Sequence, residues 1–353
     1  MAQTSHNHTF PYQINLLDSE INKELLQYFH GEKTGFVQVG PEKYFFPYKY
    51  KSEAENYYNF KARPSDIWVV TCPRSGTTWT QEMVWLLCND LDFLTAKQIK
   101  LTERFPFFEF HLFVHPEIKK QILEEVAHNK EQQEFIELIS TPGYKLLSEI
   151  PETKRRFIKT HFPLSLLPPS VMEQKCKIIY VARNPMDVAV SYYYLNRLYR
   201  TQGYVGNFER YWTYFQDGLN PWLPYFSHVR EAMQHRKSSN FLYLQYEDMS
   251  TDLQGSIKRI ANFLGCDLDY SKMEALLQHL NISNFRLNTS VNGQEMMDAH
   301  ILNKENNGFV RNGVAGSSFA EFQAVPGLFE QANKWITENI TALKTNGNKT
   351  ETT

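Results

Sequence analysis

The sequence predicts an α/β fold, a single domain with a central parallel sheet flanked by helices. Four short apolar runs, rich in β-branched or aromatic residues, have the length and composition of buried strands. Segments with helical periodicity lie between and after these runs. No internal repeat and no linker rich in Pro, Gly or Ser divides the 353 residues, a length that one α/β unit can accommodate.

The predicted elements alternate along the chain. The strands are predicted at residues 67–71, 157–159, 177–182 and 241–245. The helices are predicted at residues 77–87, 187–200, 208–218, 251–264 and 272–280. Strands that alternate with helices form parallel sheets with right-handed crossovers. Ligands of such sheets bind beyond the carboxyl ends of the strands, so the informative residues should follow each strand directly.

Composition excludes several classes of function. Lys and Arg number 37 against 39 Asp and Glu, so the net charge of −2 gives no bulk attraction to nucleic acid or to an anionic membrane. The four cysteines lie far apart without a C-x-x-C spacing, which argues against a thiolate metal site and favours a reducing, cytoplasmic location. Residues 1–11 lack the apolar run of a signal peptide, and no stretch has the length of a membrane span.

The turn after the first strand has the residues of a phosphate cradle. It reads Arg74, Ser75, Gly76, Thr77, Thr78 and Trp79. Free backbone N–H groups at a helix start, together with hydroxyl groups, can hold an anion. The turn is not a Walker A motif because the lysine spacing is missing. A helix start capped by Ser75 or Thr77 fits these residues as well, and Trp79 suits either the core or an adenine ring.

The second strand ends in Lys159-Thr160-His161. Lys159 and His161 are two residues apart, so on an extended chain both side chains point to the same side. Transfer of an anionic group onto a hydroxyl needs a cation at the leaving oxygen and a base for the hydroxyl, and this pair offers both. The alternative is a surface lysine beside a structural histidine.

Three further segments carry polar candidates. Arg183 follows the third strand and Ser191 lies in the next helix, a combination that suits a second anion, although Arg183 can equally pair with Asp187. Tyr246 follows the fourth strand. A basic, glycine-containing loop lies at residues 311–316, and it also fits an ordinary turn. Residues 154–156 are interpreted as a solvated basic face.

Taken together and in this order, these segments resemble the cytosolic sulfotransferase family. Residues 73–79 resemble its P-loop-like phosphosulfate loop, residues 159–164 its catalytic strand end, residues 183–193 its 3′-phosphate segment and residues 311–316 its C-terminal loop. Residues 112–143 are similar to the extra helical segment of insect members of the retinol dehydratase type. The expected organisation is an N-terminal segment at 1–60 that packs on a sulfotransferase domain at 61–343, followed by a disordered tail at 344–353.

The resemblance implies a donor, 3′-phosphoadenosine 5′-phosphosulfate, with adenosine 3′,5′-bisphosphate as its product, and no metal. It implies His161 as the general base, with Lys159 and Arg74 also catalytic. The residues implied to bind the donor are Arg74, Ser75, Gly76, Thr77, Thr78, Trp79, Arg183, Ser191, Tyr246, Arg311, Asn312 and Gly313.

Three departures from the family pattern concern the donor site and the oligomer. Arg74 stands where a Lys is usual, and it keeps the charge but cannot donate a proton. Asn312 also replaces a usual Lys, and residues 317–319 replace the usual Asp-Trp-Lys. The family's dimer motif is not matched, so we do not carry that dimer over.

The acceptor is expected to be a small apolar molecule with a hydroxyl, such as a phenol, sterol or retinoid alcohol. The aromatic residues Phe105, Phe107, Phe108 and Phe162 are predicted to line its pocket, although such residues also form plain core. Three functions stay open. The enzyme releases a stable sulfate ester, or it eliminates a transient sulfate as a dehydratase, or the protein only binds a nucleotide or an apolar ligand.

Overall fold

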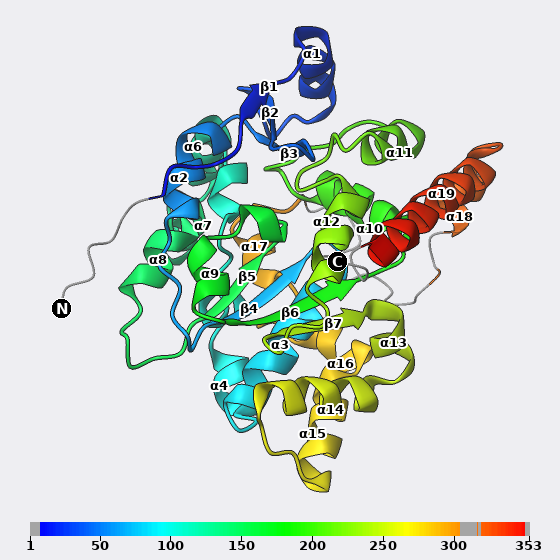
Figure 1. The fold of residues 1–353 in the computed structure, drawn as a ribbon. Coiled ribbons are helices and arrows are strands. Elements are labelled where there is room, and N and C mark those ends of the chain that lie inside the picture. Colours follow the sequence, from blue (N-terminus) through cyan, green and yellow to red (C-terminus); the bar gives the residue numbers. More distant parts are fainter. Residues whose placement is uncertain (1–7, 304–315, 317–318, 350–353) are drawn as a thin grey trace.

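The computed structural model describes residues 8–303, 316 and 319–349. At its centre lies a four-stranded parallel sheet with the strand order β5-β4-β6-β7 (Figure 1). The strands are β4 (Ile67–Thr71), β5 (Phe157–Thr160), β6 (Lys177–Ala182) and β7 (Phe241–Gln245). Each lies within one residue of its predicted bounds, and the predicted α/β fold class is confirmed.

The five helices predicted from periodicity are also present. They are α3 (Thr77–Cys88), α10 (Pro185–Leu198), α11 (Phe208–Gln216), α14 (Leu253–Leu264) and α15 (Tyr270–Leu280). Two of them begin two residues earlier than predicted because of their caps. Asn184 accepts a hydrogen bond from Met186 N before α10, and Asp269 accepts one from Lys272 N before α15.

Helices cover both faces of the sheet, which explains why its strands do not alternate between apolar and polar residues (Figure 1). Trp68 and Val70 of β4 belong to a core that includes residues of α10 and α11. Ile67 and Val69 belong to the opposite core, which includes residues of α3, α14 and α15. Successive residues of β4 therefore point into two different cores.

The remaining helices were not individually predicted. They are α4 (Phe93–Gln98), α5 (Leu101–Arg104), α6 (Pro116–Glu125), α7 (Lys130–Ser140), α8 (Gly143–Glu149), α9 (Pro169–Glu173), α12 (Tyr225–Gln234), α13 (Tyr246–Thr251), α16 (Ile282–Leu287), α17 (Gln294–Asp298), α18 (Phe319–Gln323) and α19 (Leu328–Lys349), with the short 3-10 helices η1 (Phe110–Phe113) and η2 (Leu164–Leu166). The predicted helical segment 112–143 contains α6 and α7. The helical backbone of α19 runs to Lys349, past residue 343, where the sequence predicts a disordered tail. Among the described helices, none is both long enough and apolar enough to cross a bilayer.

The N-terminal segment forms an antiparallel sheet that the sequence did not predict. It consists of β1 (Ile14–Leu16), β2 (Phe36–Val39) and β3 (Tyr44–Pro47), with α1 (Ser19–Tyr28) and α2 (Tyr50–Tyr58). Phe36 and Phe45 stack at 4.7 Å, and both belong to the core shared with α10 and α11. The N–H of Phe45 donates to the carbonyl oxygen of Leu223 at 2.9 Å. β2 and β3 are short and mostly buried, so their sequences lack the alternation that would reveal them, and β1 has only three residues.

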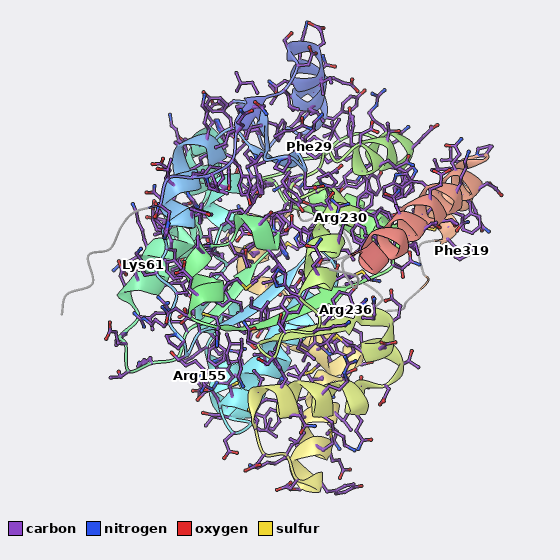
Figure 2. All side chains as sticks on the ribbon, in the orientation of Figure 1. Phe29, Lys61, Arg155, Arg230, Arg236 and Phe319 are labelled. Carbon is purple, nitrogen blue, oxygen red and sulfur yellow. The ribbon has the colours of Figure 1, made fainter. Side chains whose placement is uncertain are left out.

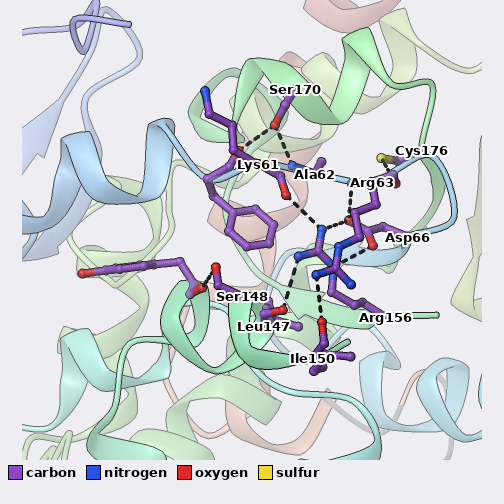
Figure 3. A network of polar contacts seen from close by, with 12 residues as sticks. Lys61, Ala62, Arg63, Asp66, Leu147, Ser148, Ile150, Arg156, Ser170 and Cys176 are labelled. Carbon is purple, nitrogen blue, oxygen red and sulfur yellow. Dashed lines mark hydrogen bonds and ion pairs between the residues drawn. The ribbon is translucent and has the colours of Figure 1, made fainter. Parts of the chain in front are cut away.

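A buried ion pair joins the amino ends of β4 and β5 (Figure 3). Arg156 donates from Nε to Oδ1 of Asp66 at 2.8 Å and from Nη2 to Oδ2 at 2.5 Å. The same guanidinium donates to the carbonyl oxygen of Lys61 at 3.0 Å. The interpretation of residues 154–156 as a solvated face is therefore wrong for Arg156, which is buried directly before β5. It holds for Arg155, which is exposed (Figure 2).

Candidate active site

Side chains from four distant segments meet in one cavity of about 200 Å³ beyond the carboxyl ends of β4, β5, β6 and β7. The predicted residues in its wall are Arg74, Gly76, Thr77, Thr78, Trp79, Phe107, Lys159, His161, Arg183, Ser191 and Tyr246. Ser75 is fully buried and does not line the cavity. Arg311, Asn312 and Gly313 lie outside the described residues.

The turn before α3 leaves the start of that helix open. Gly76 is the residue before the first helical turn, and no side chain caps the helix there. The alternative of a start capped by Ser75 or Thr77 therefore does not hold. The φ angle of Gly76 is +96°, and a Cβ atom at this position would lie 2.7 Å from Cδ2 of Tyr246. Glycine is thus required by the backbone and by the aromatic ring packed against it.

Two guanidinium groups and a hydroxyl form one wall of the cavity. Arg74 donates from Nε to Oγ of Ser191 at 2.9 Å, and Arg183 donates from Nη1 to the carbonyl oxygen of Arg74 at 3.0 Å. Arg183 also lies 3.8 Å from Oδ2 of Asp187, so the ion pair considered from the sequence is present within the cluster. This wall can hold a multiply charged anion.

Aromatic rings lie beside these cations. The Arg183 guanidinium lies 4.2 Å from the ring centroid of Tyr246. The ring of Trp79 lies 6.1 Å from that of Tyr246, and its Nε1 donates to the carbonyl oxygen of Leu280 at 3.0 Å. Phe285 adds another ring to the wall, and the sequence analysis missed it. An aromatic wall next to a cationic one suits a nucleotide base joined to phosphate groups.

His161 is held as a neutral imidazole. Its Nδ1 lies 2.8 Å from the carbonyl oxygen of Thr71, which can only accept, so Nδ1 carries the hydrogen. Burial, and the Lys159 charge nearby, hold the pKa of His161 well below its ordinary value. The rings of Phe107 and Trp222 lie 5.0 Å and 5.1 Å from the imidazole, both edge to face. Nε2 is therefore the nitrogen with a free lone pair.

Lys159 carries its ammonium group over an aromatic ring. Nζ lies 4.1 Å from the centroid of Phe107, a distance typical of a cation–π contact. Burial lowers the pKa of Lys159 to about 8, while the Glu109 carboxylate raises it and Arg74 lowers it further. The side chain is therefore charged at neutral pH and loses its proton more easily than an exposed lysine.

Glu109 is a functional candidate that the sequence analysis missed. Its fully buried carboxyl accepts hydrogen bonds from His161 N at 2.6 Å, Thr160 Oγ1 at 2.8 Å and Trp222 Nε1 at 2.9 Å. Burial raises its pKa to about 8, but all three donors stabilise the ionised form, and two of them, the His161 N–H and the Trp222 indole N–H, cannot accept a carboxyl proton. We therefore assign it as a carboxylate. An acid inside the aromatic run 105–110 was the signal in the sequence.

The predicted pocket phenylalanines divide into two groups. Phe107 lines the cavity described above, and Phe105 lines a neighbouring one. Phe108 and Phe162 are instead fully buried in the core and line neither cavity, which corrects their predicted place. The reason is alternation along extended chain. Phe107 pairs with Lys159 in a parallel bridge, so Phe108 and Phe162 point to the opposite side from Phe107 and His161.

Comparisons with known proteins match most of this chain. Residues 64–344 match the family model of the sulfotransferase domain. The luciferin sulfotransferase of Photinus pyralis is 34% identical over 325 residues, which cover 91% of this chain and 83% of that protein. Two crystal structures of retinol dehydratase, one with androsterone and the inactive cofactor PAP and one with retinol and PAP, match with a TM-score of 0.86. They are 37% and 36% identical, and the matches cover 94% of this chain and 97% and 98% of theirs.

Proposed function

The chain belongs to the sulfotransferase family, and we propose that it transfers a sulfuryl group from 3′-phosphoadenosine 5′-phosphosulfate to the hydroxyl of a small apolar acceptor. One observation carries this proposal. Arg74, Lys159 and Arg183 line a single cavity together with a neutral histidine. The family uses this donor, and the two retinol dehydratase structures contain PAP, adenosine 3′,5′-bisphosphate. The same two structures also contain androsterone and retinol, which supports an apolar alcohol as the acceptor of this chain.

The donor would be held by both ends. The open N–H groups at the start of α3, with the hydroxyls of Thr77 and Thr78, would bind its 5′-phosphosulfate. Arg183 and Ser191 would bind its 3′-phosphate, and the rings of Trp79 and Tyr246 would hold the adenine. The role of Arg311, Asn312 and Gly313 in binding the donor rests on the family resemblance alone.

The reacting groups would be His161 and Lys159. His161 would accept the proton of the acceptor hydroxyl at Nε2, so that the oxygen attacks the sulfur. Lys159 would place its positive charge at the oxygen that leaves with the 5′-phosphate as the old sulfur–oxygen bond breaks. Arg74 adds charge but cannot protonate that oxygen, which leaves Lys159 as the candidate proton donor. Glu109 would position the strand end that carries both side chains.

A radiolabelled donor assay tests this function. The protein is incubated with labelled donor and a panel of phenols, sterols and retinoid alcohols, and we expect transfer of the label to at least one of them. Titration with adenosine 3′,5′-bisphosphate should release heat and raise the melting temperature. No transfer and no response to the nucleotide would overturn the proposal. A nucleotide response without transfer would instead favour the binding protein considered above.

A second function, elimination of a transient sulfate, is favoured by the 36–37% identity to retinol dehydratase. Retinol as the acceptor separates the two activities. A retained retinyl sulfate indicates simple transfer, whereas a hydrocarbon with released sulfate indicates a dehydratase. The cytoplasmic location expected from the cysteines stays a proposal.

A further inference from the structure

A second cavity of about 100 Å³ lies next to the catalytic one. The two cavities share the wall residues Thr78, Phe107, Phe110, Lys159 and Tyr199. The rest of the second wall is largely apolar and comes from α5, α7 and residues 290–296, with Leu101, Leu138, Ile139 and Met296 among its members. A molecule in the second cavity would therefore have one end at Lys159 and its body among apolar side chains.

Glu295 is an acid in this apolar wall. Its Oε1 accepts a hydrogen bond from Oγ1 of Thr102 at 2.7 Å, and Thr102 also lines the cavity. Its Oε2 is buried and has no hydrogen-bond partner among the described residues. The neighbouring Arg104 donates from Nη2 to Oε2 of Glu82 at 2.7 Å, and its Nη1 is also buried without a hydrogen-bond partner among the described residues, so neither nitrogen bonds Glu295.

An unpartnered carboxyl oxygen next to an apolar cavity requires an explanation, because buried polar atoms are nearly always hydrogen-bonded. A purely structural acid would find its second partner within the protein, as Glu109 does with three donors. A ligand in the cavity can supply the missing partner for Glu295. The cost of leaving such a group unpaired then discriminates against ligands that lack the matching polar group.

We propose that the second cavity holds the body of the acceptor and that Glu295 binds a second hydroxyl at the end remote from the reacting one. This inference rests on the proposed function and narrows it. The preferred acceptors are elongated apolar diols, whose two hydroxyls lie at opposite ends, and not simple apolar alcohols.

The second group is assigned as a hydroxyl because it suits both forms of the carboxyl. Burial raises the pKa of Glu295 to about 7, so both forms are populated near neutrality. A hydroxyl donates to the carboxylate and accepts from the carboxylic acid. A ketone pairs only with the acid, and an ammonium group only with the carboxylate.

Flexible linear substrates provide the test, because their fit depends on length and not on ring shape. We would measure kcat/KM for a series of α,ω-alkanediols and the matching n-alkanols, with the wild type and with Glu295→Leu. We expect a preference for the diol that peaks at one chain length in the wild type. Glu295→Leu should lower the ratio of diol to mono-ol at that length by about tenfold, the effect of one hydrogen bond.

Two controls separate this inference from other causes. Glu134→Ala removes an exposed acid of α7, a helix that also contributes to the cavity wall, and should leave the ratio unchanged. If Glu295→Leu fails to fold, Glu295→Met takes its place. A rise in melting temperature on addition of adenosine 3′,5′-bisphosphate checks that the variant is folded and binds the nucleotide. An equal ratio in the wild type and the folded variant would overturn the inference while transfer itself continues.

Binding to the nucleotide-saturated protein gives the same comparison without turnover. Diols and mono-ols compete there with a fluorescent apolar probe, and a diol preference lost in the Glu295 variant supports the inference. Equal competition overturns it. Absence of transfer to every alcohol would count against the proposed function, and the competition data would still decide the role of Glu295.

Discussion

Nδ1 of His161 lies 2.8 Å from the carbonyl oxygen of Thr71, so the end of β5 is joined to the end of β4 through the imidazole. Because the carbonyl accepts, the ring nitrogen with the free lone pair is Nε2. The tautomer is thus set by the pairing of two strands, which the apolar sequences of β4 and β5 determine. The orientation of the candidate base is a direct consequence of the fold.

Replacing His161 by alanine should remove the base and leave the donor site in place. We expect the rate of sulfuryl transfer to fall by about 100- to 10,000-fold, which is the usual contribution of a general base. The dissociation constant of adenosine 3′,5′-bisphosphate, measured calorimetrically, should stay within about twofold, because the anion-binding wall is built from other residues. His128→Ala, at an exposed histidine, is the matched control. Full activity in His161→Ala would remove the base from the mechanism.

Lys159 should set the alkaline limit of activity. Burial lowers its pKa to about 8, so the ammonium is present below pH 8 and is lost as the pH rises through that value. The kcat/KM for the donor, which reports the free enzyme, should therefore fall above about pH 8 instead of near 10.5. The Lys159→Arg variant, whose side chain is permanently charged, should turn over more slowly than the wild type. Its kcat/KM should not show this alkaline decrease. A profile that stays flat to pH 9.5 would contradict the assignment.

Glu109→Gln should damage catalysis more than folding. The amide offers one acceptor oxygen to three donors, and its NH₂ group would face one of them. We expect kcat/KM to fall by about 100-fold through misplacement of the strand end. Loss of the negative charge also lowers the pKa of Lys159, so the alkaline limb should move to lower pH.

Glu231→Gln is a matched control for this prediction. Glu231 also accepts three hydrogen bonds, from Tyr44 Oη and from the backbone N–H and hydroxyl of Ser165, and it does not line the catalytic cavity. The Glu231→Gln variant should have a changed free energy of unfolding and an unchanged pH profile of kcat/KM. If both variants kept the wild-type profile, the role of Glu109 would be structural only.

The parts of the site that follow strands could be predicted, because strand position fixes them. Lys159, His161 and Arg183 each come within a residue of a strand end, and buried strands of a parallel sheet are visible as apolar runs. Glu109 could not be predicted, since its indole partner lies 113 residues further along the chain. The distinction between Phe107 and Phe108 also depended on a tertiary feature, the bridge to Lys159 that sets which side chain faces the cavity.

Asp66→Ala should destabilise the protein by about 3–5 kcal/mol, because it leaves the buried Arg156 guanidinium without its counter-charge. Urea denaturation measures this change. Activity of the folded protein should be preserved, since the pair lies at the amino ends of β4 and β5, opposite the cavity. Glu134→Ala breaks the exposed pair with Lys130 and should cost at most about 0.5 kcal/mol. Similar decreases in the free energy of unfolding of the two variants would contradict the structural role of Asp66.

Gly76→Ala and Gly265→Ala separate backbone strain from damage to the donor site. Both glycines have positive φ angles, +96° and +75°, so each alanine should lower the free energy of unfolding by about 1 kcal/mol or more. A Cβ atom at Gly265 meets nothing within 4 Å, whereas one at Gly76 lies 2.7 Å from the Tyr246 ring. Only Gly76→Ala must displace that ring from the cavity wall.

We therefore expect Gly76→Ala to weaken the binding of adenosine 3′,5′-bisphosphate by about tenfold or more, because one displaced aromatic contact is worth about 1 kcal/mol or more and the adjacent N–H groups move with the turn. Gly265→Ala should bind the nucleotide as the wild type does. Calorimetric titration of both variants, at a temperature where each is folded, measures the difference. Equal dissociation constants would mean that the Tyr246 ring and the turn before α3 do not contact the nucleotide, and the donor site would then have to be placed elsewhere in the cavity.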